Sequence, residues 1–227
     1  SETGEELLLN NISVRVRFAK LGRAKYISHL DLIRCFQRAV CRAGLPAAYS
    51  AGFHPHMQTS FAATLPLGFT STAEVMELSL SEPVPPEEVL SRLNAALPPD
   101  IRILEAGAPQ HTFRELAYAT YTVELPCGEP EALAKQFDAF LAQPEILVQK
   151  RSKKGMREVD LKPMVEQAEA VPESQQLVLH LCLPSGSSSS LNPMLLLHAL
   201  EDFVQIPLRT PRICRTALLT AEKTKFF

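Results

Sequence analysis

The segment 13–46, SVRVRFAKLGRAKYISHLDLIRCFQRAVCRAGLP, determines how the first half of the chain folds. Its opening places Val14, Val16 and Phe18 on one side of an extended chain and two arginines on the other. Strict alternation of apolar and polar residues is typical of a β-strand that is buried on one face. We therefore expect a half-buried strand at the start of this segment.

A helix is expected next in the same segment. Ser28 is a favourable N-cap, and Asp31 stands three residues later in the capping-box position. Apolar residues then recur at helical spacing as far as Val40, and Gly44 ends the pattern. Three arginines fall at every fourth position and so form one basic stripe on this helix, namely Arg34, Arg38 and Arg42.

The rest of the first half continues with extended, helical and extended patterns. Residues 58–67 and 72–80 read as strands, 85–97 as a helix that begins with prolines, and 101–108 as a closing strand. The order is β-α-β-β-α-β, which is the split β-α-β pattern of ferredoxin-like folds.

The second half repeats this rhythm less cleanly and includes a charged hairpin that turns at the KKG of residues 153–155. The serine-rich stretch 185–190 is expected to be a polar turn. The expected elements are a strand at 117–126, a helix at 130–143, hairpin strands at 145–152 and 157–163, a strand at 175–184, a helix at 192–204 and a strand at 212–220.

Together the two halves predict an α+β protein of two tandem ferredoxin-like (split β-α-β) domains. The acidic, polar opening at 1–12 is interpreted as a linker or tail. The domains are expected at 13–109 and 116–227. A chain of 227 residues is long enough for two cores of about 100 residues each.

Composition excludes several protein classes. No apolar run approaches the roughly 18 residues that span a bilayer, and no basic-then-apolar leader opens the chain, so we expect a cytoplasmic protein without membrane contact. The five cysteines have no CxxC or iron–sulfur spacing and are interpreted as reduced thiols. Nucleotide loops of the GxxxxGKS kind and GxSxG elbows are absent from the sequence, which leaves ATPase and hydrolase interpretations without support.

Charge is concentrated although the net charge is only −2. Between residues 14 and 58 a single Asp31 opposes eight basic residues, which are Arg15, Arg17, Lys20, Arg23, Lys25, Arg34, Arg38 and Arg42. A second basic group occupies the expected hairpin and consists of Lys150, Arg151, Lys153, Lys154 and Arg157. Clustered cations favour a polyanion such as RNA, because bound phosphates release counterions. The alternative is a solvated face of a mixed-charge protein, and for the hairpin a solvated turn.

Three stretches, at 16–46, 50–68 and 157–163, resemble the radical-SAM-linked domain family, a bacterial family of uncharacterised function. The resemblance implies that the chain serves a radical SAM enzyme that also carries a cobalamin-binding-type domain, either fused to it or separate. An iron–sulfur cluster and S-adenosylmethionine would then belong to that partner, and this chain would hold no cofactor. The acidic opening would be the tether from an upstream enzyme.

The loop 52–56, GFHPH, combines unusual residues between two apolar runs. Gly52 permits an uncommon backbone turn and Pro55 fixes one, while Phe53 stands between them. His54 and His56 point the same way in an extended segment, and with a third ligand such a pair can bind a metal. The alternatives are a shaped turn with local hydrogen bonds and a contact with RNA or protein.

His29 follows the N-cap, where the positive end of the helix disfavours imidazole protonation. Beside Lys25 and Tyr26 it forms a candidate acid–base group for RNA cleavage. The chain from Gly44 to His54 is long enough to fold back along the helix. We therefore hypothesise that His29, His54 and the Lys25–Tyr26 turn line one electropositive groove.

The first functional expectation is a non-catalytic accessory domain that recognises structured RNA or a ribonucleoprotein such as the ribosome. The alternatives are a docking module for the radical SAM enzyme and a metal-independent endoribonuclease, an analogy of fold with the CRISPR repeat endonucleases. No metal site is expected.

Overall fold

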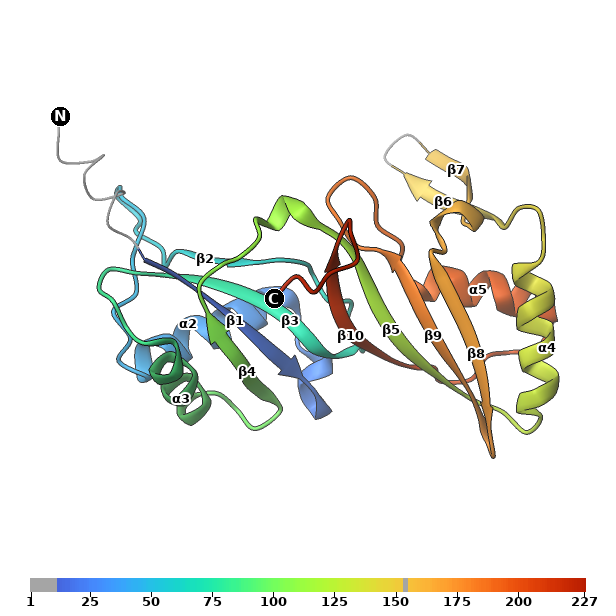
Figure 1. Ribbon diagram of the computed structural model, residues 1–227, viewed down its shortest axis with the longest axis horizontal. Helices are drawn as coiled ribbons and strands as arrows, with labels where there is room; N and C mark the ends of the chain where they lie inside the picture. Colours follow the sequence, from blue (N-terminus) through green and yellow to red (C-terminus); the bar gives the residue numbers. More distant parts are fainter. Residues whose placement is uncertain (1–11, 153–154) are drawn as a thin grey trace. The chain divides into compact units, whose positions relative to one another are not determined.

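The computed structural model describes residues 12–152 and 155–227, with the backbone alone at 151–152 (Figure 1). The protein is α+β, as the sequence predicts. It divides into two compact units: unit 1 contains the residues up to Phe113 together with Phe226 and Phe227, and unit 2 contains Arg114–Lys225. Each unit has its own antiparallel strands and its own pair of long helices.

In the part of unit 1 that the structure describes, there are four strands and two α-helices. Antiparallel pairing joins β1 to β4 and to β3, and β2 pairs with the other edge of β3, which gives the order β4-β1-β3-β2. The elements are β1 (Ile12–Lys20), the 3₁₀ helix η1 (Gly22–Tyr26), α2 (His29–Arg42), β2 (Thr59–Phe61), β3 (Thr70–Leu80), α3 (Pro86–Ala96) and β4 (Ile101–Gly107).

Both helices of unit 1 bury their apolar stripes against one sheet face. The alternation that predicted β1 is confirmed, because Val14, Val16 and Phe18 lie in the core with Phe36 and Val40 of α2. The rings of Phe18 and Phe36 meet edge to face at 4.8 Å between centroids, an arrangement that aromatic pairs prefer.

The predicted start of α2 is also confirmed. The Ser28 side chain accepts a hydrogen bond from the Asp31 backbone N–H at 3.1 Å, and its hydroxyl donates to the Asp31 carboxylate at 2.7 Å. The first of these bonds satisfies a backbone donor that the first helical turn leaves without a partner, and the second links the two side chains. The local sequence therefore fixes where α2 begins and which face it turns to the sheet.

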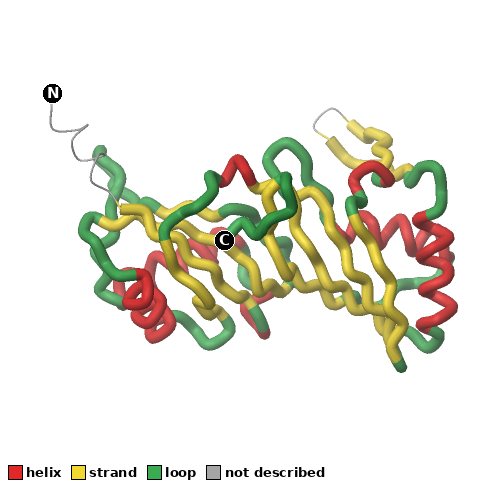
Figure 2. The backbone as a smooth tube through the Cα atoms, viewed as in Figure 1, coloured by secondary structure: helices red, strands yellow, loops and turns green. Residues whose placement is uncertain are grey.

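Unit 2 contains a four-stranded antiparallel sheet in the order β10-β5-β9-β8 and a separate two-stranded ribbon, β6-β7 (Figure 2). Its elements are η2 (Phe113–Glu115), which starts at the end of unit 1, β5 (Leu116–Pro126), α4 (Pro130–Leu141), β6 (Leu147–Ser152), β7 (Gly155–Asp160), η3 (Lys162–Met164), β8 (Gln167–Glu173), β9 (Gln176–Pro184), α5 (Pro193–Val204) and β10 (Arg212–Thr220).

The sequence expectation omitted β8. Its residues, QAEAVPE, combine polar with small or apolar side chains and include Pro172, and the strand pairs on one side with β9 at the edge of the sheet. Proline is tolerated at such an edge because one backbone N–H there needs no partner within the sheet. The charged hairpin is present, but it forms its own ribbon beside the sheet.

Within the described residues, none of the helices has both the length and the apolar character needed to cross a lipid bilayer.

Candidate functional site

The loop that follows α2 is closed at its base. Tyr49 and Met57 form an isolated antiparallel bridge, and the Ser50 N–H donates to the His56 carbonyl oxygen at 2.9 Å. Gly52, near the tip, has a φ of +118°, a backbone conformation that residues with a side chain rarely adopt. Residues 49–57, termed the Phe53 loop, therefore form a defined hairpin.

Local hydrogen bonds hold His56 in this loop. Its Nδ1 lies 3.1 Å from both the Ser50 Oγ and the His54 carbonyl oxygen, and its backbone N–H donates to the same Ser50 Oγ at 3.1 Å. His54 itself is exposed. Within the described residues, the structure places no group of three or more His, Cys, Asp or Glu side chains where they could hold a metal ion.

A hollow of about 500 Å³ lies between the Phe53 loop and the last two turns of α2. On the helix side the spacing of three and four residues brings Arg38, Cys41 and Arg42 onto one face. The complete lining is Gln37, Arg38, Cys41, Arg42, Tyr49, Pro55, His56 and Met57. The hollow therefore combines two guanidinium groups with aromatic and hydroxyl groups of the loop.

Two aromatic side chains of the loop face solvent. Tyr49 is half exposed, while Phe53 is fully exposed at the tip. The Tyr49 hydroxyl lies 4.0 Å from the Cys41 sulfur, and this contact raises the pKa of the tyrosine above its ordinary value of 10.0. Tyr49 therefore remains neutral near pH 7 and can donate a hydrogen bond to an anion.

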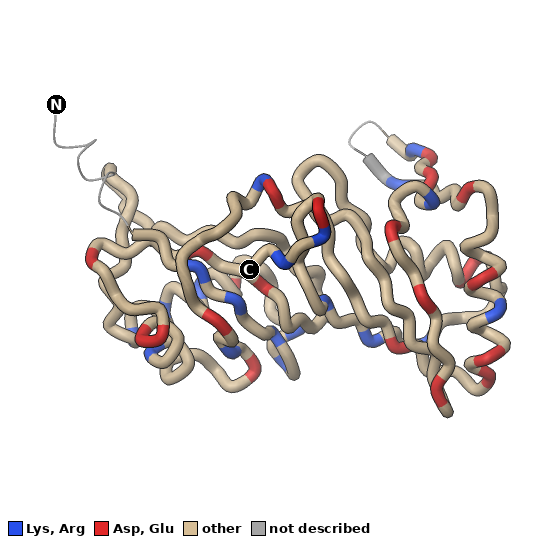
Figure 3. The backbone as a smooth tube through the Cα atoms, viewed as in Figure 1, with Lys and Arg blue, Asp and Glu red and all other residues tan. Residues whose placement is uncertain are grey.

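The three arginines of the stripe on α2 are all exposed, and they differ in their partners. Figure 3 colours the lysine and arginine positions along the backbone blue. Arg34 pairs with Asp31 at 3.2 Å, and Arg42 donates to the Ala96 carbonyl oxygen at 2.7 Å. Arg38 makes no hydrogen bond or ion pair with the residues that the structure describes. Its guanidinium, at the edge of the hollow, is thus the most available of the three for a phosphate.

The basic residues of β1 require a correction. Arg15 and Lys20 are each only 2% exposed, so they cannot contact a phosphate in this structure. Arg15 pairs with Glu77 at 2.8 Å and lies about 5 Å from the ring centroids of Phe113 and Phe226. The alternation of β1 leaves Arg15 outside the helix-covered core, but distant aromatic residues bury it.

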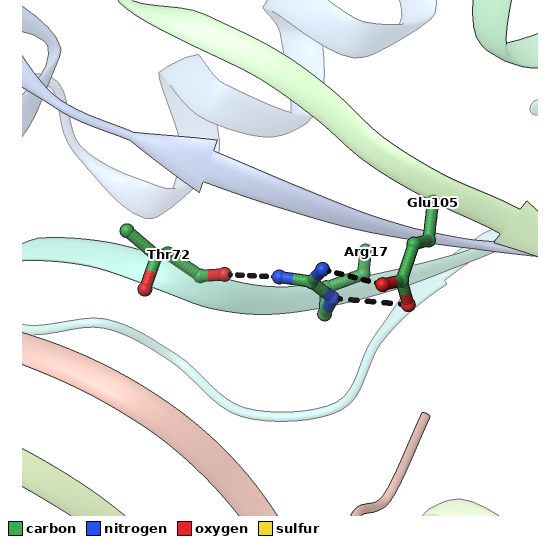
Figure 4. A network of polar contacts seen from close by, with 3 residues as sticks. All are labelled: Arg17, Thr72 and Glu105. Carbon is green, nitrogen blue, oxygen red and sulfur yellow. Dashed lines mark hydrogen bonds and ion pairs between the residues drawn. The ribbon is translucent and has the colours of Figure 1, made fainter.

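Arg17 is partly exposed, and all three nitrogens of its guanidinium donate hydrogen bonds within the protein. It donates from Nε and Nη2 to the two carboxylate oxygens of Glu105, at 3.3 and 2.7 Å, and from Nη1 to the Thr72 carbonyl oxygen at 2.8 Å (Figure 4). This bidentate geometry fixes the plane of the guanidinium. Arg17 therefore ties β1 to its two neighbouring strands.

The turn before α2 lies away from the hollow. The Lys25 ammonium is 5.0 Å from the Tyr26 ring centroid, and the His29 ring meets the Phe61 ring edge-on at 5.3 Å. The exposed Arg23 donates its backbone N–H to Asp100 at 2.8 Å. His29 thus lies at the first turn of α2, whereas the hollow that His56 lines borders the last two turns of this helix. The single groove from His29 to His54 stays a prediction.

The basic group of unit 2 lies on the β6-β7 ribbon. Lys150 and Arg157 are directly opposite each other on the two strands, and both line a second hollow of about 430 Å³. The predicted contacts Lys153, Lys154 and the side chain of Arg151 fall outside the described residues.

Sequence reasoning missed several lining residues. The helical spacing that grouped the arginines also places Gln37 and Cys41 beside them, so periodicity contained that signal. The base of the Phe53 loop is closed by the bridge between Tyr49 and Met57, and no local pattern predicts such a bridge.

A family model described as "Uncharacterized protein conserved in bacteria (DUF2344)" matches residues 13–193, more than half of the chain. A search of curated proteins found no match.

Among solved structures, a chain of a Cbf5-Nop10-Gar1 complex is similar with a TM-score of 0.49 and 11% identity, over 94% of this chain and 50% of that one. This chain therefore spans half the length of that protein. An unknown protein from Galdieria sulphuraria gives a TM-score of 0.26 at 14% identity, with 89% of this chain and 96% of that chain covered. A structure described as "putative glycine cleavage system transcriptional repressor" gives a TM-score of 0.24 at 15% identity, with 92% of this chain and 98% of that chain covered.

Proposed function

The chain belongs to the bacterial family of uncharacterised proteins DUF2344, and from this premise we propose that it binds structured RNA or a ribonucleoprotein through α2 and the Phe53 loop. The observation that carries the proposal is the unpaired guanidinium of Arg38 beside a hollow that also presents Tyr49 and His56. The fully exposed Phe53 ring on the same loop supports it.

The chemistry of these groups matches an irregular RNA surface. An arginine without a carboxylate partner is available for backbone phosphates, which supply most of the binding free energy and its salt dependence. An exposed aromatic ring stacks on a base that is unpaired in a loop or bulge. The combination favours RNA with unpaired bases over a uniform duplex.

We infer that both units are versions of one split β-α-β fold. The strand orders β4-β1-β3-β2 and β10-β5-β9-β8 correspond strand by strand when the β6-β7 ribbon is treated as an insertion after α4. On this interpretation the Phe53 loop connects the first helix to the second strand of unit 1. The β6-β7 ribbon occupies the equivalent connection in unit 2.

The proposed biological context is a radical SAM enzyme that acts on the bound RNA or ribonucleoprotein. The sequence resemblance supports this context. The partner would supply the iron–sulfur cluster and S-adenosylmethionine, and this chain would position the substrate without catalysing a reaction. Docking of the enzyme itself onto α2 is the alternative use of the same surface.

Fluorescence anisotropy with a labelled RNA stem–loop tests the proposal. Affinity should fall steeply between about 50 and 200 mM salt, because phosphate contacts release counterions. Arg38→Gln should lower the salt slope by about 1. Arg102→Gln is the matched control, since this exposed arginine of β4 alternates with the core residues Ile101 and Ile103 and so points away from α2.

The proposal fails if Arg38→Gln and Arg102→Gln bind the RNA with the same affinity and salt slope, or if RNA binding does not respond to salt. A cleaved RNA product in the same samples would instead indicate a ribonuclease. Binding of the purified radical SAM enzyme with weak salt dependence would indicate the docking module.

A further inference from the structure

The second hollow, in unit 2, has the properties of an anion site that the proposed function does not use. It measures about 430 Å³ and lies between the β6-β7 ribbon, the serine-rich turn and the start of α5. Its lining is Lys150, Arg157, Val159, Leu161, Met164, Ser188, Ser189, Ser190, Leu191 and Leu195. The hollow is therefore lined by two cationic side chains, three hydroxyl groups and five apolar side chains.

The two cations of this hollow oppose each other. Lys150 and Arg157 are a directly facing pair on the β6-β7 ribbon, so both side chains project from the same face. Like charges at such positions destabilise a ribbon. Neither side chain forms an ion pair or hydrogen bond with the residues that the structure describes. The adjacent Glu158 is engaged by Gln149 at 3.1 Å and alternates to the opposite face. An anion between Lys150 and Arg157 would relieve their repulsion.

The facing wall supplies neutral donors. Ser188, Ser189 and Ser190 are exposed on the turn before α5, and a bridge between Ser185 and Ser190 closes that turn. Each hydroxyl can donate one hydrogen bond to a phosphate oxygen.

The start of α5 adds a favourable field. Leu191 precedes the N-cap Asn192, Leu195 belongs to the first turn, and both leucines line the hollow. The positive end of the helix dipole therefore borders the space, where it favours negative charge.

The floor of the hollow is apolar. Val159, Leu161, Met164, Leu191 and Leu195 form it, and Leu161 and Leu191 are buried. Small-ligand sites commonly have a volume of a few hundred Å³ and an apolar lining with a few convergent polar groups. A free phosphate would leave this floor unused, whereas a phosphate attached to a flat ring would cover it.

We propose that this hollow binds a nucleoside monophosphate unit. The phosphate lies between Lys150, Arg157 and the serine hydroxyls, and the base lies over Met164 and Leu195. The unit is either a free nucleotide or the 5′-phosphorylated end of an RNA strand. The site shares no residue with the hollow of Arg38 and the Phe53 loop, so its test is independent of the test of the proposed function.

Equilibrium dialysis with adenosine 5′-monophosphate tests the site in the whole chain. Binding is expected for the monophosphate and not for adenosine. Lys150→Gln and Arg157→Gln should each weaken it about tenfold, because hydrogen bonds to charged groups are the strong ones. Arg157→Lys should keep most of the affinity. The exposed Lys135 of α4 is the control, and Lys135→Gln should change nothing.

Oligonucleotides distinguish the two sources. A 5′-phosphorylated trinucleotide that binds more tightly than its 5′-hydroxyl form, and more tightly than the free monophosphate, identifies an RNA end. A free monophosphate that binds more tightly than the 5′-phosphorylated trinucleotide identifies a free nucleotide. The proposal is overturned if neither probe binds, or if adenosine binds as well as its monophosphate. It is also overturned if Lys150→Gln and Arg157→Gln bind like the control.

Discussion

The Nη2 atom of Arg15 donates to the Oε2 atom of Glu77 over 2.8 Å, although only 2% of the arginine is exposed. The pair joins directly opposed positions of β1 and β3. Its geometry explains how a strand pattern that predicts an exposed basic face yields a buried cation. The charge is tolerated because a carboxylate and two aromatic rings contact the guanidinium.

Loss of Glu77 alone should destabilise the protein strongly. Glu77→Leu leaves the Arg15 charge buried without its partner, and we expect the free energy of unfolding to fall by about 3 kcal/mol. The double variant Arg15→Met with Glu77→Leu should recover most of this loss, because it removes both charges. Urea denaturation measures both values. Equal instability of the single and double variants would contradict the assigned role of the pair.

The Ser28 cap should contribute measurably to unit 1. Ser28→Ala removes the acceptor for the Asp31 backbone N–H, and we expect a loss of about 1 kcal/mol in the free energy of unfolding. Ser174→Ala, in the exposed turn between β8 and β9, is a control for the hydroxyl itself. Thermal or urea unfolding followed by circular dichroism compares them. If Ser28→Ala is as stable as Ser174→Ala, the Ser28 cap does not stabilise the protein.

Lys20 should make stability depend on alkaline pH. Burial lowers the pKa of this lysine below its ordinary value of 10.5, and the nearby Glu74 opposes the shift more weakly. As pH rises through the folded-state pKa towards 10.5, native Lys20 releases its proton before the unfolded chain does. The unfolded state then binds more protons, so stability attributable to Lys20 increases with pH in that window.

Comparison with Lys20→Met isolates this effect from other titrating groups. The free energy of unfolding of the parent protein minus that of the variant should increase across the alkaline window. Urea denaturation at a series of pH values below 10.5 provides the measurement. A difference that is flat, or that decreases, would show that burial does not govern this lysine.

Phe53 and Arg38 should affect RNA binding in different ways. Phe53→Ala removes a stacking surface, and we expect binding to weaken by about 1 to 3 kcal/mol with an unchanged salt slope. Arg38→Gln should reduce that slope, because it removes a phosphate contact. Phe53→Leu keeps an apolar side chain without a ring and is the matched control. Binding by Phe53→Leu equal to that of the parent protein would exclude stacking.

Short-range signals were sufficient to predict α2 and β1. The cap at Ser28, the apolar stripe and the alternation of β1 involve residues at most a few positions apart, and local physics decides them. The edge strand β8 was missed because most of its residues are exposed, among them Gln167, Glu169 and Glu173, and the residues that it half buries are the small Ala168 and Ala170. A strand of this composition is defined by pairing with β9.

The burial of Arg15 and Lys20 could not be predicted from their own surroundings. The Phe113 and Phe226 rings that cover Arg15 come from distant positions, and the carbonyl oxygen of Ile27 that receives the Lys20 ammonium lies beyond the η1 turn. In the candidate site, helical periodicity predicts the shared face of Arg38 and Arg42. The hollow beside them depends on how the Phe53 loop folds, which is a tertiary property.

The place of Phe226 in unit 1 has a consequence for synthesis on the ribosome. Its side chain is fully buried, yet residues 114–225 separate it from the rest of the unit. Until residues 114–225 have been translated, the nascent unit 1 therefore lacks the Phe226 ring that covers part of the Arg15 side chain. Contacts across so long a separation close late, because the entropy of the intervening chain opposes them. Unit 1 is thus translated before unit 2 but is completed after it.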